Sequence, residues 1–248
     1  MLSESLDRLA LLHPKLIDLG LERTFELLEK AGNPHKNLPP IFHIAGTNGK
    51  GSVCAYLFSV AKQLGLKTHC YTSPHLCRFN ERIRIANNLI GDEELLRVLD
   101  EVEKLNQSKP ITFYEITTVA AFMAFARIPA DLLILETGLG GRLDATNVIE
   151  NPLASIITPI SRDHEHFLGS ELTQIAGEKA GIIKKNVPVI SASQTKEVER
   201  TLSNKAREMD APIFFEGADF IWEQISTGEV KLECKNRNEW PKVDLKLL

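Results

Sequence analysis

The sequence lacks the long apolar runs and the leader that would direct a chain into or across a membrane. No apolar stretch approaches the roughly 18 residues that a bilayer-spanning helix needs, and the start, MLSESLDRLALLHPK, has no basic region followed by an apolar one. Cysteine is also scarce. Four cysteines without a CxxC pair are too few to stabilise a chain of 248 residues by disulfides. We therefore expect a cytoplasmic protein with reduced thiols in packed positions at Cys54, Cys70, Cys77 and Cys234.

An excess of positive charge is absent as well. Lysine and arginine total 29 against 33 aspartates and glutamates, and the net charge of -4 offers no broad attraction for nucleic acid or acidic membranes. The composition, 43% hydrophobic and 25% charged, excludes intrinsic disorder for most of the chain. We therefore expect small-molecule partners, and any anionic substrate must be held by local groups.

From about residue 41 onward, strand-like apolar runs alternate with helix-like runs, without repeats or low-complexity tracts. This alternation predicts an α/β fold, with a mostly parallel sheet and flanking helices. The predicted strands are residues 41–45, 67–71, 131–136, 153–158, 187–192 and 212–216, and the predicted helices are residues 53–64, 92–106, 114–127, 171–184 and 195–209.

Residues 1–40 are predicted to be a helical appendage packed on the sheet, because their helix-like pattern ends in breaks at Gly32-Asn33-Pro34 and Pro39-Pro40. No linker is evident afterwards, so residues 41–248 are assigned to one domain. Its last part, residues 221–248, alternates polar and apolar residues in the manner of strands.

A glycine-rich turn is the strongest signal in the sequence. It follows a predicted strand, precedes a predicted helix and comprises Gly46, Thr47, Asn48, Gly49, Lys50, Gly51 and Ser52. Backbone N–H groups and a helix N-terminus suit phosphate, while Lys50 can reach the β and γ phosphates and Ser52 can ligate Mg²⁺. The common GxxxxGK[ST] pattern is not matched, and a plain turn between strand and helix is the alternative.

The segment GTNGKGS resembles the nucleotide loop of the Mur-ligase superfamily, in particular its folylpolyglutamate synthase and dihydrofolate synthase branch. Further segments resemble this branch in the same order: HPKLIDLGLER (13–23), YTSPHLCRFNERIRI (71–85), TFYEITTVAAF (112–122), LETGLGGRLDATN (135–147), ITPISRDHEHFLG (157–169) and IAGEKAGIIK (175–184). The resemblance implies the P-loop-containing central domain of a Mur ligase. In the family a smaller Rossmann-like domain follows, and because no counterpart is found here, we expect the domain to be incomplete at its C-terminal end.

Two cation sites are implied by the resemblance. Glu136 ends an apolar predicted strand, where a carboxylate can hold Mg²⁺. The resemblance assigns a second cation to Glu136, His164 and Ser73, in addition to the role of Ser52 at the phosphate loop. From the residues alone, a capping or ion-paired Glu136, a turn serine and a histidine bonded to Asp163 are the alternatives.

Lys179 matches a lysine that members of the superfamily carry as a CO₂-derived carbamate. This chemistry needs a neutral amine, so burial or a neighbouring cation must lower the lysine pKa. A solvated helix lysine is the alternative.

The remaining motifs point to a pterin substrate. The residues that open the helix at 112 combine an acid with aromatic rings, which suits a flat heteroaromatic ring, although a capped core helix explains them equally well. The resemblance assigns substrate contacts to Lys15, Leu16, Ile17, Asp18, Thr112, Phe113, Tyr114, Glu115, Leu143, Asp144 and Ala145. Arg82 and Arg142 are candidates for substrate carboxylates or ordinary surface residues.

The resemblance therefore implies a monomeric ligase that uses ATP to activate the carboxylate of dihydropteroate or folate and joins it to glutamate. Its catalytic residues would be Lys50, Glu136, His164 and Lys179. A nucleotide-binding remnant and another Mur-type amide ligase are the alternatives. Since the second domain is not found, we expect this chain alone to bind nucleotide without appreciable ligation.

Overall fold

A mostly parallel, eight-stranded sheet forms the centre of the molecule, with strand order β4-β3-β2-β5-β1-β6-β7-β8. The structure is a computed structural model, and it describes residues 2–226, 229–234 and 244–246. The strands are β1 (Ile41–Ala45), β2 (Thr68–Tyr71), β3 (Ile83–Ile85), β4 (Asn88–Leu89), β5 (Leu132–Glu136), β6 (Ala154–Ile157), β7 (Val189–Ser191) and β8 (Ile213–Phe215). The predicted α/β fold is confirmed, and each predicted strand is present.

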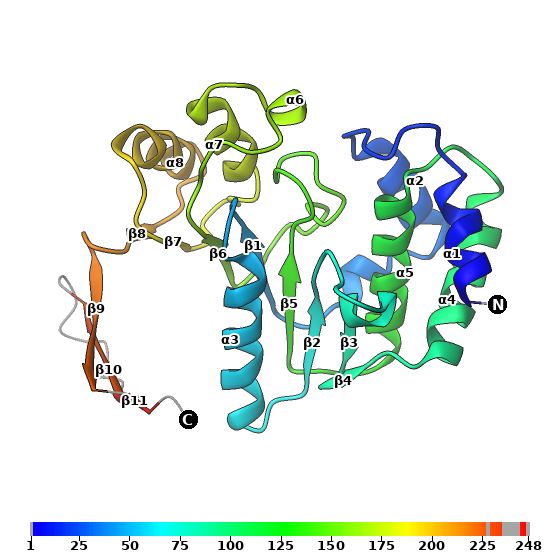
Figure 1. Cartoon of the computed structure of the whole chain (residues 1–248), viewed down its shortest axis with the longest axis horizontal. Coiled ribbons are helices and arrows are strands. Elements are labelled where there is room, and N and C mark those ends of the chain that lie inside the picture. The colour runs from blue at the N-terminus through cyan, green and yellow to red at the C-terminus, as the bar shows by residue number, and fades with distance from the viewer. Residues whose placement is uncertain (1, 227–228, 235–243, 247–248) are drawn as a thin grey trace.

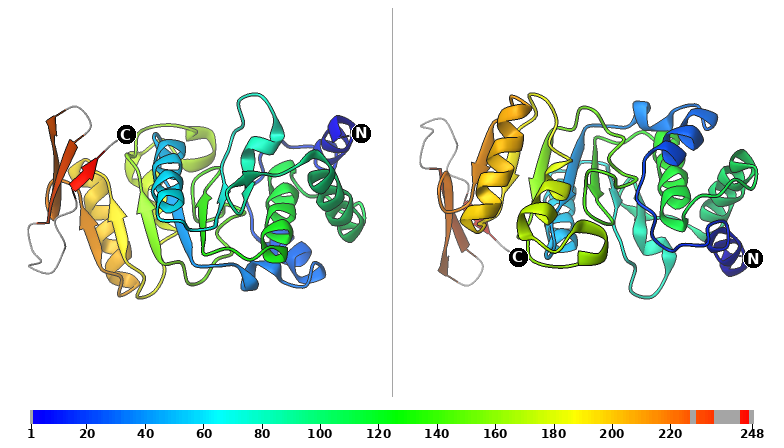
Figure 2. Two further views of the ribbon diagram at one scale, coloured as in Figure 1. Left: turned by 90° about the horizontal axis from the view of Figure 1, so that it is seen from below. Right: turned by 90° about the horizontal axis from the view of Figure 1, so that it is seen from above.

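The helices are α1 (Leu2–Ala10), α2 (Glu22–Lys30), α3 (Lys50–Gln63), α4 (Asp92–Asn106), α5 (Phe113–Arg127), α6 (Glu165–Leu168), α7 (Leu172–Ala180) and α8 (Lys196–Glu208), together with two 3-10 turns at Pro34–Asn37 and Phe79–Arg82. Helices cover the sheet in Figures 1 and 2, with α3 standing alone in front of its middle. Helix α3 starts at Lys50 rather than at residue 53, because Gly49 caps it in a left-handed conformation. Sequence analysis missed α6 and the short antiparallel strands β3 and β4.

Four parallel neighbours, β2, β5, β1 and β6, set the position of the loops. Because parallel strands end at the same edge of a sheet, the loops that follow them gather there. The glycine-rich turn follows β1, Ser73 follows β2 and Glu136 is the last residue of β5. This edge therefore brings together segments that lie far apart in the sequence.

The N-terminal helices α1 and α2 pack mainly on α4 and α5, at one end of the sheet (Figure 1). Leu9, Leu27 and Leu28 are buried in the same apolar cluster as Val119 of α5. The segment thus contacts mainly α4 and α5, and its apolar cluster also includes Ile83 and Leu133 of the sheet.

The C-terminal part forms a separate three-stranded antiparallel sheet of β9 (Phe220–Ser226), β10 (Glu229–Cys234) and β11 (Asp244–Lys246). Figures 1 and 2 show it beyond β8, at the opposite end from α1. The strand character predicted for this part is present, but its strands do not extend the main sheet. Of the predicted residues 221–248, those at 227–228, 235–243 and 247–248 lie outside the described residues.

The thiols are only partly packed. Cys54 and Cys70 are buried and free, and burial raises the pKa of Cys70 to about 12, whereas Cys77 is free and exposed. The expectation of packed thiols was therefore wrong for Cys77, and the side chain of Cys234 lies outside the described residues. Across the part of the chain that is described, no helix is long and apolar enough to cross a bilayer.

The loop after β5 rests against the end of α7 through close glycine contacts. A Cβ atom on Gly181 would lie 2.3 Å from the Cα of Arg142, and one on Gly141 would lie 2.8 Å from the Glu178 carbonyl oxygen. The Arg142 N–H donates to that carbonyl at 2.7 Å. The two segments therefore approach at backbone distance.

Replacing Gly181 with alanine should destabilise the fold by about 2 kcal/mol, because the new methyl group clashes with backbone that cannot move freely. The matched control is Gly177→Ala within α7, where a Cβ meets nothing within 4 Å. This control should gain up to about 1 kcal/mol, since alanine favours helix over glycine. Urea denaturation of both variants measures the difference, and equal stabilities would contradict the proposed contact.

Candidate active site

The glycine-rich loop is fixed against the end of β6. A Cβ atom on Gly46 would lie 1.8 Å from Oγ1 of Thr158, so the approach requires glycine. The Thr47 N–H donates to the Pro159 carbonyl at 3.1 Å, and the Thr47 hydroxyl donates to the Ser161 carbonyl at 3.1 Å. The loop therefore has a defined shape that its own chain maintains.

Two lysine ammonium groups converge on the same carbonyl oxygen. Nζ of Lys50 donates to the Gly46 carbonyl at 3.2 Å, and Nζ of Lys179 donates to it at 2.8 Å. Lys179 is only 3% exposed, and its burial, followed by the charge of Lys50, lowers its pKa to about 8. A neutral Lys179 amine is therefore accessible near physiological pH, directly beside the glycine-rich loop.

Glu136 lies buried at the end of β5, and its Oε2 accepts the backbone N–H of Ser73 at 3.2 Å. Burial raises the pKa of this carboxyl to about 6, although the N–H of Ser73 and the charge of Lys50 oppose the increase. The structure thus places Glu136 beside the backbone of Ser73. Ser52 lies exposed in the first turn of α3.

His164 caps the short helix α6 with a positive φ of 51°. Its backbone N–H donates to Oδ1 of Asp163 at 2.8 Å, and its ring lies 3.6 Å from the other oxygen of that carboxylate. His164 and Ser73 border the same cavity, whereas His166 does not border it. Within the described ranges, no group of three His, Cys, Asp or Glu side chains could hold a metal ion.

A cavity of about 410 Å³ opens beside these groups. It brings together every predicted substrate residue except Lys15, from three separate segments of the chain. Its lining residues are Leu16, Ile17, Asp18, Leu19, Gly20, Ser73, Pro74, Arg82, Thr112, Phe113, Tyr114, Glu115, Gly138, Leu139, Leu143, Asp144, Ala145 and His164. Five further lining residues were not assigned, although each lies within a segment quoted for the resemblance: Leu19, Gly20, Pro74, Gly138 and Leu139.

The two candidate arginines differ in whether they line the cavity. Arg82 lines the cavity, and its Nε donates to the ring of His75 at 2.9 Å. Arg142 forms an ion pair with Glu178 at 2.8 Å and does not border the cavity. Arg82 is therefore the one of the two that faces the cavity.

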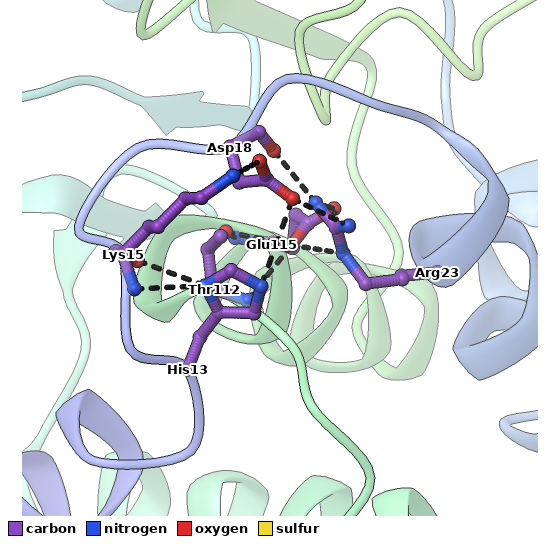
Figure 3. A network of polar contacts seen from close by, with 6 residues as sticks. All are labelled: His13, Lys15, Asp18, Arg23, Thr112 and Glu115. Atoms are coloured by element: carbon purple, nitrogen blue, oxygen red, sulfur yellow. Dashed lines mark hydrogen bonds and ion pairs between the residues drawn. The ribbon is translucent and has the colours of Figure 1, made fainter.

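Figure 3 shows an ionic network, of which Asp18, Thr112 and Glu115 line the cavity. Nε of Arg23 donates to both oxygens of Glu115 at 3.1 Å, while its NH1 group donates to Asp18 at 2.9 Å. The N–H and hydroxyl of Thr112 donate to the same Glu115 carboxylate at 2.8 and 2.7 Å. Nζ of Lys15 donates to Asp18 at 3.0 Å. Glu115 therefore takes part in the N-terminal cap of α5 and pairs with Arg23, as the capped-helix alternative expected. Glu115 also borders the cavity.

Fold and site together define an α/β protein with a glycine-rich loop after β1 and a cavity of about 410 Å³ at the carboxyl edge of its sheet. A scan of protein-family profiles finds no match. Among curated proteins, the chain is 42% identical over 200 residues to the dihydrofolate synthase/folylpolyglutamate synthase of Bacillus subtilis, covering 78% of this chain and 46% of that protein.

Solved structures agree with this relationship. Escherichia coli FolC in complex with DHPP and ADP superposes with a TM-score of 0.87 at 33% identity, over 94% of this chain and 55% of that one. A bifunctional folylpolyglutamate synthase/dihydrofolate synthase with Mn, AMPPNP and L-glutamate bound gives a TM-score of 0.84 at 32% identity, over 95% and 56%. The chain belongs to the dihydrofolate synthase/folylpolyglutamate synthase family, and it spans about half the length of the curated relatives it matches.

Replacing Arg23 with methionine should destabilise the fold by about 2 kcal/mol, because the buried Glu115 carboxylate loses its cation. The control is Arg8→Met, which breaks the ion pair of Arg8 with Glu103 at a half-exposed guanidinium and should change stability little. Thermal unfolding at matched pH measures both effects. Equal losses in the two variants would show that burial does not decide the strength of these pairs.

Proposed function

We propose that the chain is the nucleotide- and pterin-binding part of an ATP-dependent ligase that joins glutamate to the carboxylate of dihydropteroate or a folate. The observation that carries this proposal is the cavity, which combines the predicted substrate segments with Ser73 and His164. Family membership supports the same chemistry, because relatives are named for it and one was solved with DHPP and ADP. Activity of the whole enzyme requires what the other half of such relatives supplies.

The residues at the loop fit a nucleotide with its magnesium ion. The close contact of Gly46 with Thr158 maintains the shape of the loop, and Lys50 places a positive charge beside it. The hydroxyl of Ser52 and the carboxylate of Glu136 are hard oxygen ligands of the kind that Mg²⁺ prefers. Ser73 and His164 complete the set that we propose for a second cation.

ATP supplies the phosphoryl group that makes the substrate carboxylate reactive toward the glutamate amine, and the products are an amide, ADP and phosphate. We assign Lys50 to the orientation and neutralisation of the phosphates. We assign the walls of the cavity, from Leu16 to Asp18 and around Tyr114, to the flat pterin ring.

We propose that Lys179 carries a carbamate formed from CO₂. Its burial and its lowered pKa of about 8 supply the neutral amine that this reaction needs. The resulting anion would lie beside Lys50, and it would replace a buried positive charge with a negative one near the cation ligands.

The first test is nucleotide binding to the 248-residue chain. Lys50→Ala should weaken ADP·Mg affinity roughly tenfold to hundredfold, because a charge-assisted contact contributes about 1.5 to 3 kcal/mol. Lys62→Ala, at an exposed site near the other end of α3, is the control and should leave the affinity unchanged. Calorimetric titration measures both variants, and the same affinity for Lys50→Ala and the parent would remove the phosphate-loop assignment.

The second test uses pH. Because the pKa of Glu136 is raised to about 6, its carboxylate is protonated and lost as a ligand when the pH falls below that value. Mn²⁺ affinity in the presence of ADP should therefore drop between pH 7.5 and pH 5 in the parent more than in Glu136→Gln. Protonation of the nucleotide affects both proteins equally, so the difference between their pH profiles isolates Glu136. Parallel profiles, recorded by electron paramagnetic resonance, would exclude this ligand role.

The third test is ligation itself. The chain alone, supplied with ATP, Mg²⁺, dihydropteroate and glutamate, should bind ligands but form little amide, because a partial cleft neither positions glutamate nor excludes water. Mass spectrometry detects the product. Turnover of about one per second, within the usual range of enzymes, would show that this chain is a complete ligase.

A further inference from the structure

The imidazole of His43 is buried in the middle of β1, just before the phosphate loop, and no role has been assigned to it so far. It is 0% exposed, and burial lowers its pKa to about 3, assisted by the charge of Lys184. The ring is therefore neutral at physiological pH and carries one N–H. His43 does not border the cavity.

The ring is linked to Asp144 through one hydroxyl. Nε2 of His43 lies 2.9 Å from Oγ1 of Thr146, and that hydroxyl donates to Oδ1 of Asp144 at 2.6 Å. A hydroxyl has a single proton, so Thr146 must accept the Nε2–H of His43 while donating its own proton to the carboxylate. Because the Asp144 carboxylate accepts the Thr146 hydroxyl, it determines which imidazole nitrogen is protonated.

Asp144 in turn fixes the backbone of the loop after β5. Its carboxylate is 2% exposed and accepts the N–H of Leu139 at 2.8 Å and the N–H of Thr146 at 3.0 Å. These contacts close the segment 139–146 on itself. Leu139, Leu143, Asp144 and Ala145 line the cavity, so this closed segment is one of its walls.

We propose that His43 is a positioning residue for the pterin cavity: through the Thr146 hydroxyl it orients the Asp144 carboxylate, which holds the 139–146 wall in its binding shape. This inference rests on the proposed function, since it deepens the role of the same cavity.

The histidine is not explained by packing alone. Its Nδ1 is buried and has no hydrogen-bond partner among the described residues. An unpaired buried nitrogen costs stability, and an apolar ring of similar size would avoid that cost. The contrast is His69 on β2, also 0% exposed, whose ring contacts both the Ile128 carbonyl at 3.0 Å and the Ala86 N–H at 3.1 Å. His69 therefore provides a matched control, a buried histidine that does not contact the wall.

The experiment compares the full chain with Thr146→Val, Thr146→Ser, His43→Phe and His69→Phe. Calorimetry measures affinity for 7,8-dihydropteroate and, separately, for ADP·Mg. Thr146→Val and His43→Phe should weaken dihydropteroate binding about tenfold, the scale expected for a lost polar contact, while changing ADP·Mg affinity less than about twofold. Thr146→Ser, which keeps the hydroxyl, should restore affinity, and His69→Phe should leave both affinities unchanged.

Amide hydrogen exchange without ligand provides the second readout. Thr146→Val and His43→Phe should accelerate exchange at the Leu139 and Thr146 amides relative to His69→Phe, because those amides depend on the orientation of Asp144. Unchanged exchange at both amides, or equal acceleration in His69→Phe, would overturn the inference. If the parent binds no dihydropteroate, the proposed function fails, and the exchange measurement still decides whether His43 positions the wall.

Discussion

The structure depends on one constraint, the parallel pairing of β1 with β5 on one side and β6 on the other. In this arrangement Ile44 lies opposite Glu136 and Ala45 lies opposite Ile157. The glycine-rich loop, the buried Glu136 carboxylate and Thr158 therefore leave the sheet at one level. A shift of register by one residue would reverse the facing of every side chain on the strand, so the sheet core and the site are specified together.

Burial at this edge determines the chemistry of its charged groups. The same low-polarity surroundings push Glu136 toward its neutral acid and Lys179 toward its neutral amine, so each group can change protonation state within two pH units of neutrality. Asp144, also buried, has its pKa raised by desolvation, while donors from Thr146 and Leu139 oppose that shift. Opposing influences of this kind are typical of sites where proteins hold charge for catalysis.

Sequence reasoning succeeded where the signal is local. The apolar run before Glu136 ends a strand as predicted, and the glycine-rich turn follows a strand as predicted, although α3 already starts at Lys50. Sequence reasoning failed where the partner of a residue is determined by tertiary contact. The pairing of Arg23 with Glu115 spans 92 residues, and the contact of His43 with Thr146 spans 103, so neither has a local pattern. The short β3 and β4 also escaped, because strands of three and two residues carry little periodicity.

Leu16 projects from the irregular segment between α1 and α2 at the rim of the cavity and is 81% exposed. An aromatic ligand bound in the cavity beneath Leu16 would cover this side chain and bury its apolar surface. The thermodynamic mark of such burial is a negative heat-capacity change. The enthalpy of ring binding should therefore become steadily more favourable on warming, and this slope would distinguish occupation of the cavity from binding of phosphate alone at the loop.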